Sequence, residues 1–270
     1  MFRSLQLEWL KFRTNRVFQF MTLAYMVLLP SIIFIGKNFK EMPPPIPSNK
    51  VIFEFPTVYD YLGYIGSWMA FFFFGFLVIY SITSEYGFKT LRQNIIGGMT
   101  RKEFFLSKLS FMISLCFFGT LYFVICAILI GYTHTESVNM KNMFGTEYII
   151  LRYFLMCLGY SSFGMIIAFI VRKSGFALFI YFAYIMFIEA VLRWMVHGKI
   201  TGNHYSMHFW PMNVVEDLTP LPISKMATVM VQSNKNPIVF IDYNEATGAS
   251  VIYIVLFIGL AYQYFRKADL

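Results

Sequence analysis

The sequence predicts an all-α integral membrane protein with six transmembrane helices, and three observations lead to this fold class. The 270 residues are 58% hydrophobic and 20% aromatic, while only 13% carry a charge, which excludes an ordinary soluble domain. Six apolar runs are long enough for a helix to cross the hydrocarbon core, which takes about 20 residues. Because lipid offers the backbone no hydrogen-bond partners, these runs are expected to be helical.

The spans and their charged flanks predict an orientation. The predicted spans are 17–36, 60–83, 109–131, 147–170, 174–196 and 249–265. Thirteen lysines and arginines lie on the side that holds both termini, the 84–108 segment and the 171–173 turn, against seven on the other side. Positive residues favour the cytoplasmic side, so both termini are predicted to be inside. The net charge of +8 is thereby assigned to membrane topology, and no nucleic-acid partner is expected.

The segment before the first span, 1–16, has a helical pattern. Its apolar positions are Phe2, Leu5, Trp9 and Phe12, and its polar positions include Arg3, Gln6, Arg13 and Asn15. Two interpretations remain open. The segment forms an amphipathic helix that lies in the membrane interface, or it is a basic flank that orients the first span.

The segment 84–108, between the second and third spans, has an ordered pattern of charge. Its apolar positions Phe88, Leu91, Ile95 and Met99 share one face of a helix predicted over 86–97. The adjacent glycines Gly97 and Gly98 then end this helix. Thr100 and Glu103 have the spacing of a capping box that begins the next helix. Lys108, two turns further on, is expected to reach back toward the lipid headgroups.

These residues resemble the pattern of the ABC-2-type permeases. The matching positions are Glu85, Gly87, Arg92, Gly97, Gly98, Thr100, Arg101 and Lys108. The resemblance extends over the whole chain through the N-terminal helix, the six spans and the long outer loop 197–248. It implies the membrane subunit of an ABC exporter in the cell (cytoplasmic or inner) membrane, paired with a second permease chain as a homodimer or heterodimer.

The resemblance also implies how the parts would work. The 86–97 helix would be the coupling helix, docking through Glu85, Gly87, Lys89, Arg92 and Arg101 on a separate subunit that binds ATP and Mg²⁺. Segment 1–16 would be the connecting helix, 197–248 a re-entrant lid, and the second and fifth spans would line the substrate path. No P-loop motif occurs in this sequence, so ATP hydrolysis is expected in the partner. The alternative is an accessory or scaffold protein that recruits a soluble partner without transport.

Three charged residues inside the spans are further candidates: Arg152 in the fourth span, and Glu189 and Arg193 in the fifth. Glu189 and Arg193 are four residues apart and can pair on one helix face. The predicted depth would also allow Arg152 to contact Glu189. Ionisable residues at such depth are either functional or structural pairs, and both interpretations stay open.

The remaining candidates carry little chemistry. His204 and His208 have the spacing of metal ligands on a helix, but Gly202 favours a turn there and no cysteine or carboxylate accompanies them. The three cysteines lie in apolar runs and are expected to be buried thiols. Gly164 and Ala168 form a small-residue pair that predicts close helix packing. With no catalytic constellation in the sequence, neither an enzyme nor a cofactor site is predicted.

Overall fold

The computed structural model describes residues 2–36, 49–139, 143, 148–202, 205–222 and 241–268. This described part contains helices and no strand. Within it, six helical stretches are long and apolar enough to cross a membrane, as the sequence predicts. They are Arg16–Ile35, Val58–Gly87, Arg101–His134, Ile149–Val171, Ser174–Thr201 and Tyr243–Lys267.

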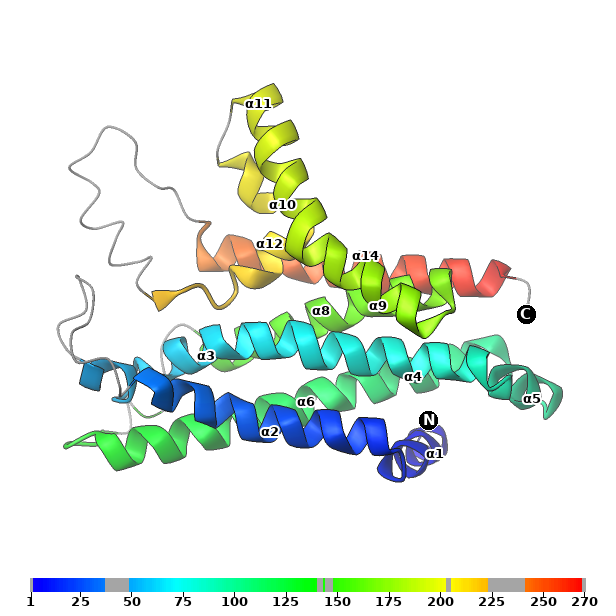
Figure 1. Ribbon diagram of the computed structural model, residues 1–270, viewed down its shortest axis with the longest axis horizontal. Helices are drawn as coiled ribbons and strands as arrows, with labels where there is room; N and C mark the ends of the chain where they lie inside the picture. The colour runs from blue at the N-terminus through cyan, green and yellow to red at the C-terminus, as the bar shows by residue number, and fades with distance from the viewer. Residues whose placement is uncertain are drawn as a thin grey trace.

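The helices follow the chain in a simple order (Figure 1). Before and within the first three spans they are α1 (Phe2–Arg13), α2 (Arg16–Ile35), α3 (Val58–Met69), α4 (Gly75–Gly87), α5 (Thr90–Ile96) and α6 (Arg101–His134). The later ones are α8 (Ile149–Val171), α9 (Ser174–Ala183), α10 (Glu189–Val191), α11 (Gly198–Thr201), α12 (Pro211–Glu216) and α14 (Tyr243–Lys267). The second span thus joins α3 to α4, and the fifth joins α9, α10 and α11.

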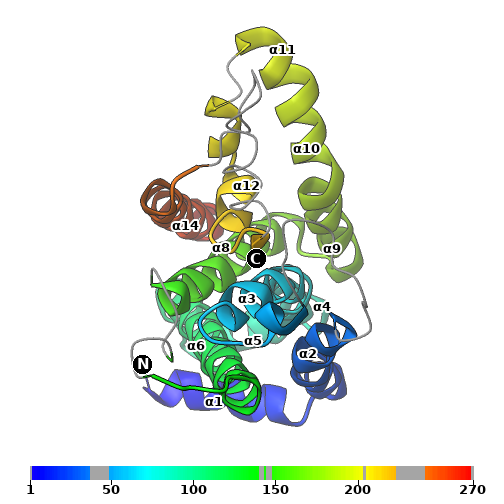
Figure 2. The ribbon, with the colours of Figure 1, turned by 90° about the vertical axis from the view of Figure 1, so that its left-hand side faces the viewer.

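Both chain termini, α1 and α5 lie at one end of the bundle, which we call the terminal end (Figure 1). An even number of spans requires this arrangement. The short helix α1 is seen end-on in Figure 1 and lengthwise in Figure 2, so it crosses the spans rather than running along them. A helix in this position would lie in the plane of a membrane that the spans cross, which favours the interfacial interpretation of 1–16.

The fourth span, α8, forms the centre of the packing and contacts α4, α6 and α14. A Cβ atom added to Gly164 of α8 would lie 3.2 Å from the carbonyl oxygen of Gly75 in α4. Ala168, one turn further along α8, is fully buried. The small-residue pair therefore packs helices within the chain, as predicted. Cys116, Cys126 and Cys157 are buried free thiols, also as predicted.

A π-helical turn, Ala70–Phe74, connects α3 to α4. The hydroxyl of Tyr181 in α9 donates to the carbonyl oxygen of Phe71 in this turn at 2.9 Å. The ring of Tyr181 occupies the space that a side chain at position 75 would need, because a Cβ added to Gly75 would lie 2.1 Å from its hydroxyl oxygen. This contact holds the first half of the fifth span against the second span.

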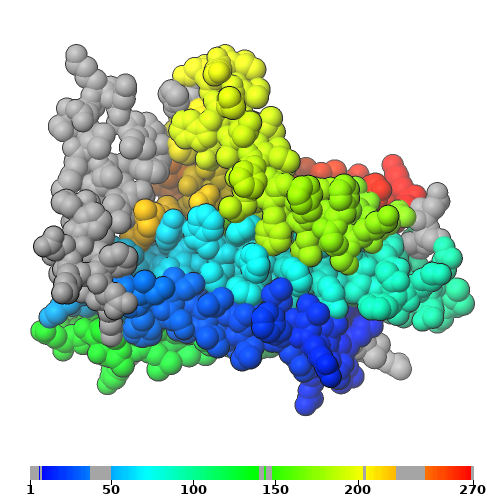
Figure 3. Space-filling model, viewed as in Figure 1, coloured from blue at the N-terminus to red at the C-terminus, as the bar shows by residue number. Residues whose placement is uncertain are grey.

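The second half of the fifth span leaves the bundle. Figures 1 and 3 show α10 and α11 leaning away from the other spans. Its large apolar side chains, including Phe187, Trp194 and Ile200, are exposed. Beside it, α12 packs between α8 and α14, beginning at Pro211, a residue suited to the first position of a helix. The predicted loop 197–248 thus contains a short helix, while residues 203–204 and 223–240 lie outside the described part.

Candidate functional site

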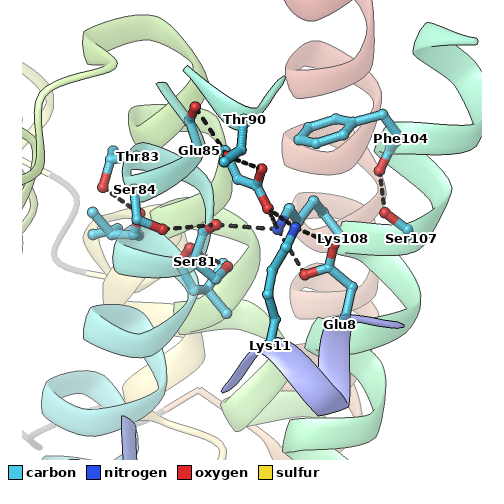
Figure 4. Close-up of polar contacts among 12 residues, drawn as sticks. Glu8, Lys11, Ser81, Thr83, Ser84, Glu85, Thr90, Phe104, Ser107 and Lys108 are labelled. Carbon is cyan, nitrogen blue, oxygen red and sulfur yellow. Dashed lines mark hydrogen bonds and ion pairs between the residues drawn. The ribbon is translucent and has the colours of Figure 1, made fainter. Parts of the chain in front are cut away.

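Four helices meet in a cluster of charged side chains at the terminal end (Figure 4). Glu8 and Lys11 come from α1, Glu85 from the last turn of α4, and Lys108 from α6. Thr90, the first residue of α5, joins them. We call these five residues the ionic cluster. It holds two carboxylates and two ammonium groups, so their formal charges cancel.

Lys108 is the centre of the ionic cluster. Its ammonium group donates to Glu8 Oε2 at 2.7 Å, to Glu85 Oε1 at 2.9 Å and to the carbonyl oxygen of Ser81 at 3.1 Å. These three bonds use all three ammonium hydrogens. The side chain is 0% exposed, and the rings of Phe12 and Phe104 lie within 5.5 Å of Nζ.

The expectation that Lys108 reaches back to the headgroups was therefore wrong. The side chain is held inside the protein because two carboxylates are there to pair with it, and a buried ammonium is stable only when paired and hydrogen-bonded. One of these carboxylates belongs to Glu8, a residue from a helix 100 positions earlier in the chain.

Glu85 connects the ionic cluster to α5. One carboxylate oxygen, Oε1, accepts from both Lys108 and Lys11. The other, Oε2, accepts from the hydroxyl of Thr90. Since Thr90 begins α5, a single buried carboxylate joins α5 to α1, α4 and α6.

The helix α5 is shorter than the predicted 86–97. The second span continues to Gly87, and Lys89 adopts a left-handed conformation with φ 58°, so the helix begins only at Thr90. It ends at Gly97 and Gly98, and Gly98 has φ +96°, as its predicted role requires. A Cβ added to Gly87 would meet no atom of the residues that the structure describes within 4 Å, so packing against them does not require glycine there.

The faces of α5 also differ from the prediction. Leu91 is buried, and Ile95 and Met99 are half-buried against the core. Phe88, expected on the same face, lies before the left-handed turn and is 74% exposed, and Ile96 is 81% exposed. The basic residues Lys89 and Arg92 are exposed beside them. A pocket of about 210 Å³ opens here, lined by Glu85, Tyr86, Lys89, Leu91, Arg92 and Arg172.

Arg101 has partners within the chain. Its guanidinium donates through Nη1 to the carbonyl oxygens of Arg266 at 2.8 Å and Ala268 at 2.7 Å, at the C-terminal end of α14. It therefore satisfies carbonyl groups that a helix end leaves without partners. The predicted capping box is confirmed next to it: Thr100 accepts from the amide of Glu103, and Glu103 accepts from the amide of Thr100.

Arg152 and Glu189 are both buried, but they have different partners. Glu189 accepts from the backbone amides of Met212 at 3.1 Å and Asn213 at 2.8 Å, at the start of α12. Arg152 donates to the carbonyl oxygen of Leu218 at 3.1 Å, and its guanidinium carbon lies 3.7 Å from the centre of the Tyr243 ring. The predicted contact between Arg152 and Glu189 is thus replaced: Glu189 contacts α12, while Arg152 contacts Leu218 after α12 and Tyr243 at the start of α14.

Arg193, one turn after Glu189, has its guanidinium carbon 5.8 Å from the ring centre of Trp194. With Glu189 it lines a pocket between the second, fourth and fifth spans and α12. His208 lies 3.6 Å from the carboxylate of Asp217, and His204 lies outside the described residues. Among the residues that the structure describes, no three histidine, cysteine or carboxylate groups are placed to share a metal ion.

Three residues of the ionic cluster, Glu8, Lys11 and Thr90, were not predicted as site residues from the sequence. Glu8 could have been noticed because it is the only acidic residue in the basic segment 1–16, three positions before Lys11. The pairing of Glu8 with Lys108 could not have been predicted, because Lys108 lies 100 positions further along the chain.

No family model matches this chain, and a search of curated proteins finds no match either.

Proposed function

We propose that this chain is the membrane-spanning permease subunit of an ATP-driven ABC transporter of the exporter type. In this proposal a separate subunit binds ATP and Mg²⁺ and docks on α5. A second permease chain, identical or different, completes the transporter in the cell membrane, with the terminal end in the cytoplasm. The proposal combines the resemblance of the sequence with the geometry of the terminal end.

The ionic cluster is the observation that supports this function best. A partner that pushes on α5 must act on the spans through something stiffer than a loop. Thr90 and Glu85 supply such a link, because the carboxylate that accepts from Thr90 also holds Lys108 of α6 and Lys11 of α1. Breaking a buried ion pair costs several kcal/mol, so force on α5 reaches the second and third spans together.

The surface of α5 supports the docking part of the proposal. Phe88 and Ile96 are large apolar side chains that remain exposed at an end of the bundle rich in charge. Basic side chains, Lys89 and Arg92, lie beside them. An exposed apolar surface with a charged rim is typical of a protein contact. The partner that fits would present an apolar pocket bordered by acidic groups.

The test is to express the tagged chain with candidate ABC ATP-binding subunits and to isolate it in mild detergent. We expect a stable complex with vanadate-sensitive ATPase activity. Replacing Ile96 with Ser should weaken the complex at least about tenfold, since losing an apolar anchor costs more than about 1.4 kcal/mol. Ile200→Ser is the matched control, because Ile200 is 77% exposed but lies in α11.

Reversing the charge of basic residues gives a second, independent test of docking on α5. Arg92→Glu should weaken the complex, while Lys102→Glu, an exposed lysine at the start of α6, should do so much less. If no ATP-binding subunit associates with the chain, or if the α5 variants bind as well as their controls, the proposal fails. A soluble partner that binds α5 without ATP hydrolysis would favour the scaffold alternative instead.

A further inference from the structure

A second pocket lies well away from the ionic cluster, beside the buried carboxylate of Glu189. It has a volume of about 190 Å³ and lies where the second, fourth and fifth spans meet α12. Its walls combine aromatic rings with charged groups, and none of these residues belongs to the ionic cluster. The helices α3, α8, α10 and α12 that surround it are seen together in Figure 2.

The aromatic wall comes from the second and fourth spans. Trp68, Phe71 and Tyr160 line the pocket, and the last two are buried. The hydroxyl of Tyr160 lies 3.3 Å from that of Ser67, so polar groups also reach the wall. A pocket with an apolar wall and a few placed polar groups is the usual form of a small-molecule site.

The charged groups belong to the fifth span and α12. Glu189 accepts from the amides of α12 with both carboxylate oxygens, so its position in the pocket wall is fixed by the protein. Glu216 and Arg193 differ from it. Among the described residues, no charged group lies within ion-pair distance of either side chain, although both line the same pocket. The Nε atom of Arg193 is buried and has no hydrogen-bond partner in the described part of the chain.

Glu216 and Arg193 thus line one pocket without forming an ion pair with each other or with another described residue, and such a pocket is complementary to a ligand with both charges. Glu216 is exposed at the wall of the pocket. Desolvation by the surrounding protein and the neighbouring Asp217 carboxylate raise its pKa, while the charge of Arg193 lowers it, so an ammonium group beside Glu216 would further stabilise its charged form. An anionic group on the same ligand would pair with Arg193, whose fork-shaped guanidinium suits carboxylate and phosphate.

We propose that this pocket binds a small zwitterion, in which an ammonium group pairs with Glu216, an anionic group pairs with Arg193, and an apolar body packs on Trp68 and Phe71. Amino acids and the headgroup of phosphatidylethanolamine share this chemistry. The inference goes beyond the proposed function, because it concerns equilibrium binding to this chain alone and needs neither ATP nor a partner.

The experiment measures binding by titration calorimetry to the full chain in nanodiscs of phosphatidylglycerol. The probes are L-phenylalanine, phenethylamine, which lacks the carboxylate, and 3-phenylpropionate, which lacks the ammonium. We expect L-phenylalanine to bind at least about tenfold more tightly than either, since each charge-assisted bond is worth about 1.5–3 kcal/mol. Phosphatidylethanolamine in the nanodisc should weaken this binding only if the lipid headgroup is also a ligand.

Two variants separate the charges. Glu216→Gln should remove the advantage over 3-phenylpropionate, and Arg193→Gln should remove the advantage over phenethylamine. Glu136→Gln, which changes an exposed carboxylate outside the pocket, is the control. Trp68→Leu should weaken all three probes.

Three results would overturn the inference. The first is no binding of L-phenylalanine to the chain in phosphatidylglycerol nanodiscs, where no phosphatidylethanolamine competes. The second is equal binding of a probe that carries a single charge. The third is binding that Glu216→Gln and Arg193→Gln leave unchanged. None of them bears on whether an ATP-binding subunit docks on α5, so this inference and the proposed function can fail separately.

Discussion

Replacing Lys108 with Met tests whether the ionic cluster is held together by charge. The change removes the ammonium but keeps an unbranched side chain of similar length. Glu8 then loses its partner at 2.7 Å, and the nearest remaining ammonium, that of Lys11, lies 3.9 Å away. Glu85 keeps its bonds to Lys11 and Thr90. The ionic cluster is left with one uncompensated negative charge.

The expected magnitude follows from this arrangement. Removing one partner of a buried ion pair costs about 3–5 kcal/mol, because the other charge is left buried and unpaired. Since Glu85 keeps two partners, we expect the lower end, a loss of about 3 kcal/mol in the free energy of unfolding. A second change, Glu8→Gln, should restore part of it, because Glu85 and Lys11 then balance each other. We expect the double variant to be more stable than Lys108→Met alone by about 1–2 kcal/mol.

The assay is unfolding in mixed micelles, followed by circular dichroism, for the unaltered chain, both single variants and the double variant. Lys102→Met is the control, because Lys102 is exposed and should change stability by less than about 0.5 kcal/mol. The reasoning is refuted if Lys108→Met is as stable as the control. It is refuted equally if the double variant is less stable than Lys108→Met alone. Restoring charge neutrality would then not stabilise the ionic cluster.

Two further predictions concern packing and helix ends. Gly159→Ala should push α12 away from α8 and cost about 1–3 kcal/mol in the free energy of unfolding, because the new Cβ would lie 2.6 Å from Val215 Cγ2. A second change, Val215→Ala, should recover most of this loss. Gly87→Ala is the control and should lose nothing, because a Cβ there would meet no atom of the described residues within 4 Å. Arg101→Ala should cost about 1–3 kcal/mol in the free energy of unfolding, since the carbonyl oxygens of Arg266 and Ala268 lose a charged donor. It should also increase amide hydrogen exchange at the end of α14. Equal exchange in Arg101→Ala and in the control Lys102→Ala would contradict this.

The sequence predicts well what neighbouring residues decide. Six spans follow from the length of the apolar runs, and the capping box follows from the spacing of Thr100 and Glu103. The end of α5 follows from Gly97 and Gly98. These features depend on the chemistry of residues within one or two helical turns, which the sequence displays directly.

The sequence does not display contacts between distant segments. The position of Lys108 depends on Glu8, and the position of Glu189 depends on backbone amides of α12, which no side-chain pattern reveals. The misplaced Phe88 has a different cause. The periodic pattern over 86–97 assumes a continuous helix, and the left-handed Lys89, a conformation that the sequence does not signal, interrupts it. The docking roles of Glu85, Gly87, Lys89, Arg92 and Arg101 stay predictions.

The ionic cluster also restricts how α5 can move. Glu85 holds Thr90 with one oxygen and both lysines with the other, so a rotation of α5 alone would break the bond to Thr90. A movement in which α1, α5 and the adjoining ends of α4 and α6 turn together keeps every contact. Because buried charged contacts are costly to break, the second movement is favoured. Helix α1 must then move with α5, so in the proposed transporter a partner that pushes on α5 would also displace α1.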